Sequence, residues 1–379
     1  MNDQLPRVFL LDPAVLQRTK EALAHDEALQ MALQQLRQQA DALLDKRPVS
    51  VVEKTQLPAS GDKHDYLSLA LYYWPDPSKP DGLPYIPRDG EVNPEVNTIP
   101  DKPNFVWMTA SVRTLALAAY FTDHAPYAAK ASELLRVWFF DEETYMKPNL
   151  NFAQMIRGLN TGRATGLIDS RHFALVVDAL GLLQLSPAWT AQDQQGMQSW
   201  FAEYLDWLLN SSFGKEESAM TNNHGTWYDV QASSIALYVG QTDVARRILQ
   251  ESATRRIQSH IQPDGSQPRE LRRTRSWHYS VFNLEAYFAL ANIAERLGID
   301  LWNYQPDGGA GLQAAVDYIL PAALKPETWP YQQLDPIRPR SLVDLLYQVS
   351  QHYHRPSYRD AAHSILGSDA ASYIGNLLY

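Results

Sequence analysis

Helical hydrophobic periodicity runs through most of this chain and constrains its fold more than any other feature. Stretches rich in Ala and Leu carry apolar residues at helical spacing. They occupy residues 13–46, 110–122, 126–140, 171–183, 190–211, 229–240, 242–261, 280–298 and 311–324. Loops carrying Pro, Gly or Asp join them, and segments that alternate apolar and polar residues are scarce. We therefore expect an all-α fold without a sizeable sheet, built from paired antiparallel helices in a superhelical or toroidal array.

One long segment, residues 58–104, departs from this pattern. It is dense in Pro, Gly and Asp, and proline at such density excludes regular helix. It also contains Tyr72, Tyr73, Trp74 and Tyr85, whose apolar ring faces need cover, so we expect the segment to be ordered. Two interpretations stay open. The segment is either a packed loop that stabilises the fold or a lid over a sugar-binding cleft, because aromatic rings stack on pyranose rings.

A second irregular stretch, residues 146–172, is polar and carries glycines between two helical segments. Its side chains include Asn151, Gln154 and Arg163. Amide and guanidinium groups bind hydroxyl and carboxylate oxygens. We therefore expect this stretch to line the same cleft.

The bulk composition is that of a soluble globular protein. Of the 379 residues 45% are hydrophobic and 20% charged, and we interpret residues 1–379 as one domain that includes the 58–104 loop. The chain has no cysteine, which excludes disulfides, thiolate metal sites and cysteine nucleophiles. Its net charge of −10 argues against general nucleic-acid binding, although a local basic cluster would still bind an anion. The first residues lack the features of a signal peptide, which leaves open a cytoplasmic protein or one whose signal has been removed.

Residues 222–228 read NNHGTWY and place Asn222, Asn223 and His224 together beside helix-like sequence. Asn is a common helix cap, and a histidine next to one is often only a hydrogen-bonded neighbour. The functional alternative is that amide and imidazole project into a pocket and bind a negatively charged ligand. These seven residues alone favour the cap.

The strongest basic cluster of the chain lies in residues 262–280, QPDGSQPRELRRTRSWHYS. After a PDGS turn, four arginines stand against a single carboxylate, that of Glu270, and His278 and Tyr279 follow. The arginines are Arg269, Arg272, Arg273 and Arg275. A charge run of this kind is usually a solvated helix face, and a lone tyrosine is usually part of a core.

Together, the two segments suggest cleavage of a uronic-acid polysaccharide by β-elimination. That reaction removes the proton on C5 and expels the oxygen on C4, and its intermediate places negative charge on the adjacent carboxylate. An enzyme must neutralise that carboxylate with Asn, Arg or His donors, and it needs a base and an acid. A tyrosine serves as either when cationic groups lower its pKa from about 10. Arg273 and His224 are candidates to supply such a field to Tyr279, and no metal or other cofactor is required.

The sequence resembles a known family at these residues. NNHGTW, followed by PRELRRTRSWHY, is similar to the alginate lyase superfamily of polysaccharide lyases, whose motifs are NNH and an Arg-rich helix that ends in Tyr. YYWPDP, DGLPYIPRDGEVNPE and NTGRATGLIDSRH resemble it too, more in the pattern of polysaccharide lyase family 38 than of family 5. The resemblance covers roughly residues 60–290. It implies an incomplete (α/α) toroid.

The resemblance also implies roles for individual residues. Asn223 would neutralise the substrate carboxylate, and His224 would act as base or neutraliser. Tyr279 would be the acid, or both acid and base, with Arg273 holding positive charge beside it. Arg272 is the alternative candidate for this role. If the segment is one continuous helix, residues 272 and 279 lie on the same face, whereas residues 273 and 279 do not. The expected substrate contacts are Asn222, Tyr72, Tyr73, Trp74, Gln154, Arg163, Arg272 and His278.

We therefore expect a metal-independent lyase that acts on β-1,4-linked uronates of alginate, polymannuronate or glucuronan. The resemblance implies a periplasmic or secreted protein. We expect it to be a monomer or a small homo-oligomer. Mannuronate and glucuronate would be cleaved by syn elimination with Tyr279 as base and acid, and guluronate by an anti path with His224 as base. A glycoside hydrolase with paired carboxylates stays open, with Asp76, Asp81, Glu91 and Asp229 as candidates. So does a non-catalytic polysaccharide-binding helical protein. Residues 352–354, HYH, are interpreted as a surface or helix end rather than a metal site.

Overall fold

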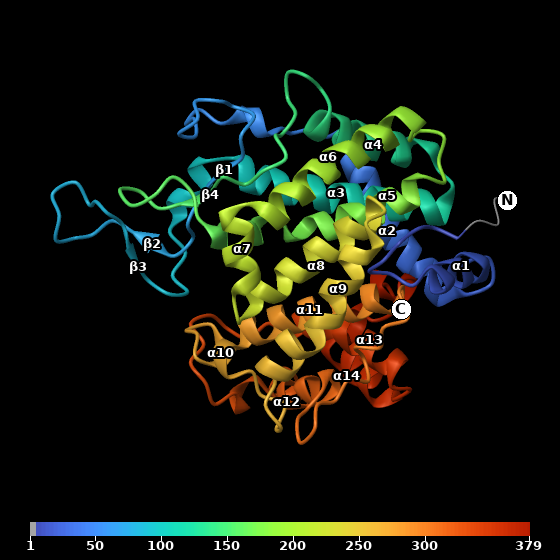
Figure 1. The fold of residues 1–379 in the computed structure, drawn as a ribbon. Coiled ribbons are helices and arrows are strands. Elements are labelled where there is room, and N and C mark those ends of the chain that lie inside the picture. The colour runs from blue at the N-terminus through green and yellow to red at the C-terminus, as the bar shows by residue number, and fades with distance from the viewer. Residues whose placement is uncertain (1–4) are drawn as a thin grey trace. The chain divides into compact units, whose positions relative to one another are not determined.

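The computed structural model describes residues 5–379, and helices make up most of it (Figure 1). This confirms the predicted all-α class. The first seven α-helices are α1 (Pro13–Ala22), α2 (Glu27–Leu44), α3 (Asp101–Thr122), α4 (Ala125–Phe139), α5 (Phe173–Leu183), α6 (Ala191–Asn210) and α7 (Ser212–Ala219). They are followed by α8 (Asn223–Tyr238), α9 (Thr242–Ser252), α10 (Pro268–Leu271), α11 (Ser276–Glu295), α12 (Leu312–Leu324), α13 (Val343–His352) and α14 (Pro356–Leu366). The strands are β1 (Leu67–Leu69), β2 (Tyr73–Trp74), β3 (Ile86–Pro87) and β4 (Phe152–Met155).

The chain divides into two compact units. Unit 1 comprises residues 5–6, 39–219 and 234–241, and unit 2 comprises residues 7–38, 220–233 and 242–379. Each unit is described by itself below. Whether the two units act as the single domain predicted from the sequence stays a prediction.

Unit 1 is built around α3, which packs against α4 and α5 (Figure 1). Its core is aromatic: the Phe105 and Phe173 ring centroids lie 5.0 Å apart, and Phe173 lies 5.0 Å from Tyr204. Both pairs meet edge to face, the arrangement that aromatic quadrupoles favour. Burial of these large rings supplies much of the driving force for folding this unit.

Residues 58–100 are irregular, as predicted, but they contain short elements. The last four residues of the predicted irregular segment, 101–104, are instead the first turn of α3, where Pro103 is tolerated because a backbone N–H there has no partner within the helix. Strand β1 pairs in parallel with β4, and β2 pairs antiparallel with β3. Each sheet has only two strands, in agreement with the expectation of no sizeable sheet. The pairing of β1 with β4 joins the 58–104 segment to the second irregular stretch. That stretch continues into the 3₁₀ helix η3 (Ala164–His172), which the sequence pattern did not predict.

Unit 2 is organised around α11. Fifteen of its side chains are buried, among them Trp277, Leu284, Tyr287 and Phe288, and they point in all directions around the helix. A helix that is apolar all round is one that others surround. Accordingly, α9, α12 and α13 pack against it, and α14 packs against α13 (Figure 1).

Several elements differ from the sequence prediction: α7, α13 and α14 lie outside the predicted helices, and α3 begins at Asp101 rather than at residue 110. The predicted helix over 13–46 is two helices. The first ends at Ala22, and Asp26 caps the second by accepting hydrogen bonds from the backbone N–H groups of Ala28 and Leu29 at 2.9 and 3.1 Å. Residues 223–228, which show no helical pattern, are the first turns of α8. The Arg-rich segment is interrupted between α10 and α11 rather than being one helix. None of the helices in residues 5–379 has the length and apolar character needed to span a bilayer.

Candidate active site

The N-terminus of α8 carries the NNH motif. The Asn222 side-chain oxygen accepts a hydrogen bond from the backbone N–H of His224 at 3.2 Å, so Asn222 caps the helix. The structural interpretation of this motif therefore holds for Asn222. Asn223 is buried, with 1% of its surface exposed, whereas His224 is half-buried.

Gly225 follows the motif because no larger residue fits there. A Cβ atom at this position would lie 2.0 Å from the Met220 carbonyl oxygen and 2.4 Å from the Arg256 guanidinium. That guanidinium donates to Asp229 at 2.7 and 3.1 Å and to the Met220 carbonyl at 2.6 Å. The Arg256 and Asp229 side chains are each 2% exposed. A paired and fully hydrogen-bonded ion pair thus holds the start of α8 in place.

The Asp229 contact also bears on the hydrolase alternative. Asp229 was one of the four carboxylates considered for a hydrolytic pair, but its two oxygens are taken up by Arg256 and it is buried. Asp76 accepts hydrogen bonds from the backbone N–H and hydroxyl of Ser78, as the first residue of a turn does. Neither residue stands as an open member of a catalytic pair.

Glu270 joins the two sequence motifs, which lie far apart in the chain. Its carboxylate accepts hydrogen bonds from the backbone N–H and the side-chain amide of Asn223, at 2.8 and 2.7 Å. The first of these bonds satisfies a backbone donor at the helix start that has no partner within the helix, where negative charge is also favoured by the helix dipole. Burial raises the pKa of Glu270, and Asn223, Arg273 and His224 oppose that rise.

The interruption between α10 and α11 decides which arginine faces Tyr279. The Arg273 guanidinium lies over the Tyr279 ring, with Cζ 3.7 Å from the ring centroid. Arg272 is exposed, and its Nε donates to the Pro268 carbonyl at 3.1 Å. The helical-face objection to Arg273 fails because residues 272–275 are not helical. The remaining two arginines are engaged elsewhere: Arg269 donates to the Thr221 carbonyl, and Arg275 pairs with Asp335.

Tyr279 lies in the first turn of α11 and is 7% exposed. The exposed imidazole of His278 stacks on Phe282 with ring centroids 5.8 Å apart, and Phe282 lies 5.2 Å from Trp227 of α8. The structure therefore places residues of both motifs in one cluster: Asn223, His224 and Trp227 from α8, and Glu270, Arg273, His278 and Tyr279 from the Arg-rich segment.

Behind this cluster lies a buried polar network. The Tyr287 hydroxyl lies 2.8 Å from His260 Nδ1 and accepts a hydrogen bond from Asn283 Nδ2 at 2.9 Å. Burial, with Arg256 and Arg269 nearby, lowers the pKa of His260 to about 3, so this histidine is neutral at physiological pH. Burial raises the pKa of Tyr287, so this hydroxyl keeps its proton. These groups are a rigid support for α11 rather than acids or bases exposed to a ligand.

Unit 1 brings together three of the predicted substrate contacts. The Arg163 guanidinium donates to the Gln154 side-chain oxygen at 2.8 Å and lies over the Tyr73 ring, 5.1 Å from its centroid. Gln154 in turn donates to Asp169 at 3.0 Å. Burial lowers the pKa of Arg163, and Tyr73 and Asp169 oppose this. Within residues 5–379, Arg163 Nε is buried without a hydrogen-bond partner, which leaves a donor for a ligand oxygen.

The other two predicted substrate contacts of the 58–104 segment, Trp74 and Tyr72, are held differently. Trp74 donates from its indole nitrogen to the Glu91 carbonyl at 2.9 Å, and the Arg88 guanidinium lies 5.2 Å from its ring centroid. Tyr72 is half-buried, and its carbonyl accepts a hydrogen bond from the backbone N–H of Arg88.

Sequence reasoning missed Glu270 and Asp169. The sequence showed Glu270 only as the single acidic residue among four arginines. That position in a basic segment was the one sign that Glu270 belongs to the site. Asp169 is 1% exposed and accepts hydrogen bonds from Lys102, Ser68 and Gln154 at 2.7, 2.7 and 3.0 Å. These bonds and the charge of Lys102 outweigh burial and lower the pKa of Asp169. No signal in the sequence marked this residue. Across the described part of the chain, no group of three or more His, Asp or Glu side chains is arranged to hold a metal ion.

Known proteins resemble this chain in sequence and in fold. The family described as alginate lyase matches residues 50–329. A crystal structure of an alginate lyase from Bacteroides ovatus has 37% sequence identity and a TM-score of 0.94, over 99% of this chain and 99% of that one. A tyrosine-to-phenylalanine variant of alginate lyase A1-III, solved with a tetrasaccharide, has 16% identity and a TM-score of 0.53 over 88% of this chain and 90% of that one, a likeness of fold alone. No curated protein matches. The matched folds are consistent with the predicted all-α toroid.

Proposed function

The chain belongs to the alginate lyase family and is a polysaccharide lyase, and on that premise we propose that it cleaves β-1,4-linked uronate polymers by metal-independent β-elimination. The candidate polymers are alginate, with polymannuronate as its simplest block, and glucuronan. The observation that carries this proposal is the Arg273 guanidinium against the Tyr279 ring, in one cluster with His224 and Asn223.

The reaction needs charge compensation more than any other assistance. The C5–H bond breaks as its proton passes to a base, the electron pair forms the C4–C5 double bond, and the C4–O bond breaks as the leaving oxygen takes a proton. Negative charge develops on the substrate carboxylate before the leaving group departs. Fixed cations and N–H donors around that carboxylate stabilise this state and need no reorganisation. In this proposal Arg273 and His224 supply the charge.

Tyr279 is the proposed acid, and for mannuronate or glucuronate also the base. A guanidinium against a phenol favours the phenolate, which takes the C5 proton and then returns a proton to the C4 oxygen on the same face. For guluronate, the C5 epimer, the proton lies on the opposite face, and His224 would be the base. The relative rates on the polymers therefore report which residue acts as base.

Asn223 is still proposed to donate a hydrogen bond to the substrate carboxylate. Only one of its two Nδ2 hydrogens is available for this. One Nδ2 hydrogen is bonded to Glu270, and an amide has two. The second is the donor proposed for the substrate. Glu270 is thus proposed as the positioning residue that fixes the Asn223 side chain. Asn222, Arg272 and His278 stay proposed substrate contacts.

In unit 1, Arg163, Gln154 and Tyr73 are proposed to bind a uronate residue of the polymer. The Arg163 Nε donor suits a carboxylate oxygen, and the tyrosine offers a ring face for the sugar. Tyr72 and Trp74 are proposed to contact the polymer from the same segment. A periplasmic or secreted location, and membership of polysaccharide lyase family 38, are proposed from the family resemblance alone.

The test is ultraviolet absorbance over time, which detects the C4–C5 double bond, on polymannuronate, polyguluronate and glucuronan with EDTA present. We expect a rise on at least one polymer, lost in Tyr279→Phe and kept in the matched control Tyr304→Phe. Tyr304 hydrogen-bonds Gln258 at 3.0 Å and belongs to neither motif. New reducing ends without absorbance would replace the lyase with a hydrolase. A rise that EDTA abolishes would refute metal independence.

A further inference from the structure

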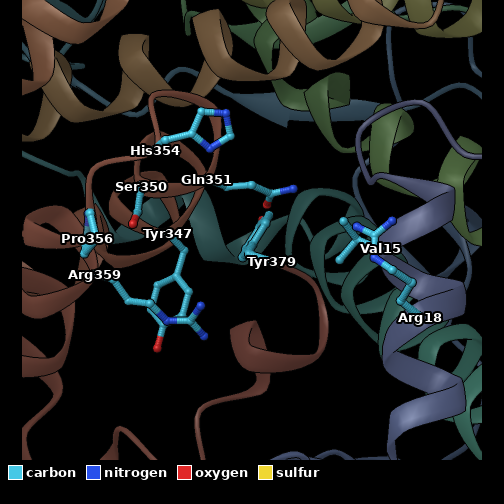
Figure 2. A pocket seen from close by; sticks show the side chains of 9 residues that line it. All are labelled: Val15, Arg18, Tyr347, Ser350, Gln351, His354, Pro356, Arg359 and Tyr379. Atoms are coloured by element: carbon cyan, nitrogen blue, oxygen red, sulfur yellow. The ribbon is translucent and has the colours of Figure 1, made fainter.

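Unit 2 contains a pocket of about 760 Å³ that shares no residue with the candidate active site (Figure 2). Its volume lies within the range of about 300 to 1,000 Å³ typical of small-molecule sites. Residues from α1, from α13 and α14 and from the end of the chain line it. Nothing in the proposed reaction uses this pocket.

The charged side chains that line the pocket are positive, whereas the whole chain has a net charge of −10. Arg18 of α1 and Arg359 of α14 both line it and are exposed, as is His354 between α13 and α14. The lining residues include no aspartate or glutamate, and the main-chain carboxylate of Tyr379 is the one negative group among them, so the two guanidinium groups still leave this pocket positive. Neither arginine forms an ion pair with any residue from 5 to 379, whereas the surface arginines Arg47 and Arg340 do. Two guanidinium groups at one pocket that have no acidic side chain as a partner attract an anion.

Two tyrosines also line the pocket, a buried Tyr347 and a half-buried Tyr379, and only the second has ring surface open to a ligand. The Arg359 guanidinium lies 4.9 Å from the Tyr347 ring centroid. The Tyr347 hydroxyl donates to the Asn376 side-chain oxygen at 2.8 Å, and the residue is 2% exposed, so this wall is rigid. The half-buried Tyr379 ring lies between the α1 side and the α13–α14 side in Figure 2. Gln351 and Ser350 add polar groups that suit hydroxyls.

We propose that this pocket is a second, non-catalytic binding site for a uronate oligosaccharide segment, held by Arg18 and Arg359 through its carboxylates. This proposal rests on the proposed function for the identity of the sugar. A simple anion would need neither the volume nor the Tyr379 ring, and a neutral sugar would not need two arginines. A polymer held here stays attached between cleavage events, which raises its effective concentration at the catalytic cluster.

The experiment is calorimetric titration of trimannuronate into the full chain carrying Tyr279→Phe, so that the oligosaccharide is not consumed. The comparison protein carries Arg18→Ala and Arg359→Ala in addition. The matched control carries Arg247→Ala and Arg340→Ala instead, two surface arginines with 59% and 60% of their side chains exposed. We expect two sites in the parent and control, and one site in the pocket variant.

Three outcomes would overturn the proposal. The first is the same number of sites, with the same affinities, in the parent and pocket variants. The second is equal binding of a neutral mannotriose at the arginine-dependent site, and the third is its complete displacement by an equal concentration of inorganic phosphate. Should alanine destabilise the chain, Arg18→Gln with Arg359→Gln keeps the polar volume and tests the same charge.

Steady-state kinetics in the wild-type background give a second readout. The pocket variant should raise KM for the polymer about tenfold while leaving kcat, and the rate on trimannuronate, unchanged. Failure of the proposed function would instead appear as no double bond on any uronate polymer with the wild-type chain. The two failures are therefore distinguishable, because arginine-dependent binding is measured without turnover.

Discussion

Replacing Glu270 by alanine should destabilise unit 2 and reduce catalysis together. The substitution leaves two buried N–H donors of Asn223, bonded at 2.8 and 2.7 Å in the native chain, without an acceptor. Each buried donor left unpaired costs about 1 to 3 kcal/mol. Burial raises the pKa of Glu270, so burying its charge opposes folding at neutral pH. Removing that charge therefore recovers part of the free energy of unfolding that the lost hydrogen bonds cost. We expect a net loss of about 2 to 4 kcal/mol.

Glutamine at position 270 separates the two effects. The glutamine side-chain oxygen still accepts a hydrogen bond from one N–H group of Asn223. The glutamine NH2 group is itself a donor, so it cannot bind the other N–H group of Asn223. We expect a stability loss of about 1 to 2 kcal/mol, smaller than that of alanine. Because Asn223 would no longer be held in one orientation, we expect kcat to fall about 10- to 100-fold, with a smaller change in KM. A purely structural role would lower the amount of folded protein and leave kcat per folded molecule unchanged.

The assay is urea unfolding of the full chain at pH 7, with kcat and KM measured on the best polymer from the absorbance test. The matched control is Glu251→Ala, which removes an exposed glutamate that pairs with surface arginines. Such pairs contribute about 0 to 1 kcal/mol. If Glu270→Ala unfolded at the urea concentration of the control, with native kcat, the argument that this carboxylate organises the site would be refuted.

Three further predictions follow from named contacts. Arg273→Ala should lower kcat/KM at least about 100-fold, whereas Arg272→Ala, which removes only a proposed substrate contact, should lower it about tenfold or less, and similar losses in both would contradict the assignment. Gly225→Ala should destabilise the chain by about 2 kcal/mol or more, measured by urea unfolding, because its Cβ would meet a backbone oxygen at 2.0 Å and a buried guanidinium at 2.4 Å. Asp193→Asn should cost about 1 to 2 kcal/mol at pH 7, because it removes the negative charge and one of the two acceptor oxygens that bind Arg136 at 2.8 and 2.6 Å. These bonds lower the pKa of Asp193 to about 2, below its ordinary value of 3.8. The stability it contributes is therefore present above pH 4, and the difference between wild type and variant should vanish as pH falls through 2.

The amino-acid sequence by itself determined the class of the fold. Apolar residues at helical spacing specify each helix locally, because a helix buries one face whatever its neighbours are. The sequence also determined which residue types stand in the two motifs, and with them the family. The prolines of residues 58–100 excluded α-helix there, whereas Pro103 lies in the first turn of α3, where proline is tolerated.

The tertiary structure decided how these residues combine. Helical spacing alone could not choose between Arg272 and Arg273, because the choice depends on a break in the helix that local propensity did not reveal. The same holds for Glu270, whose partner Asn223 lies in another helix and whose pKa is set by burial. Contacts between residues distant in the chain depend on packing, and burial changes what a charge costs. The sequence therefore supplied the chemical groups of the site, and packing supplied their geometry.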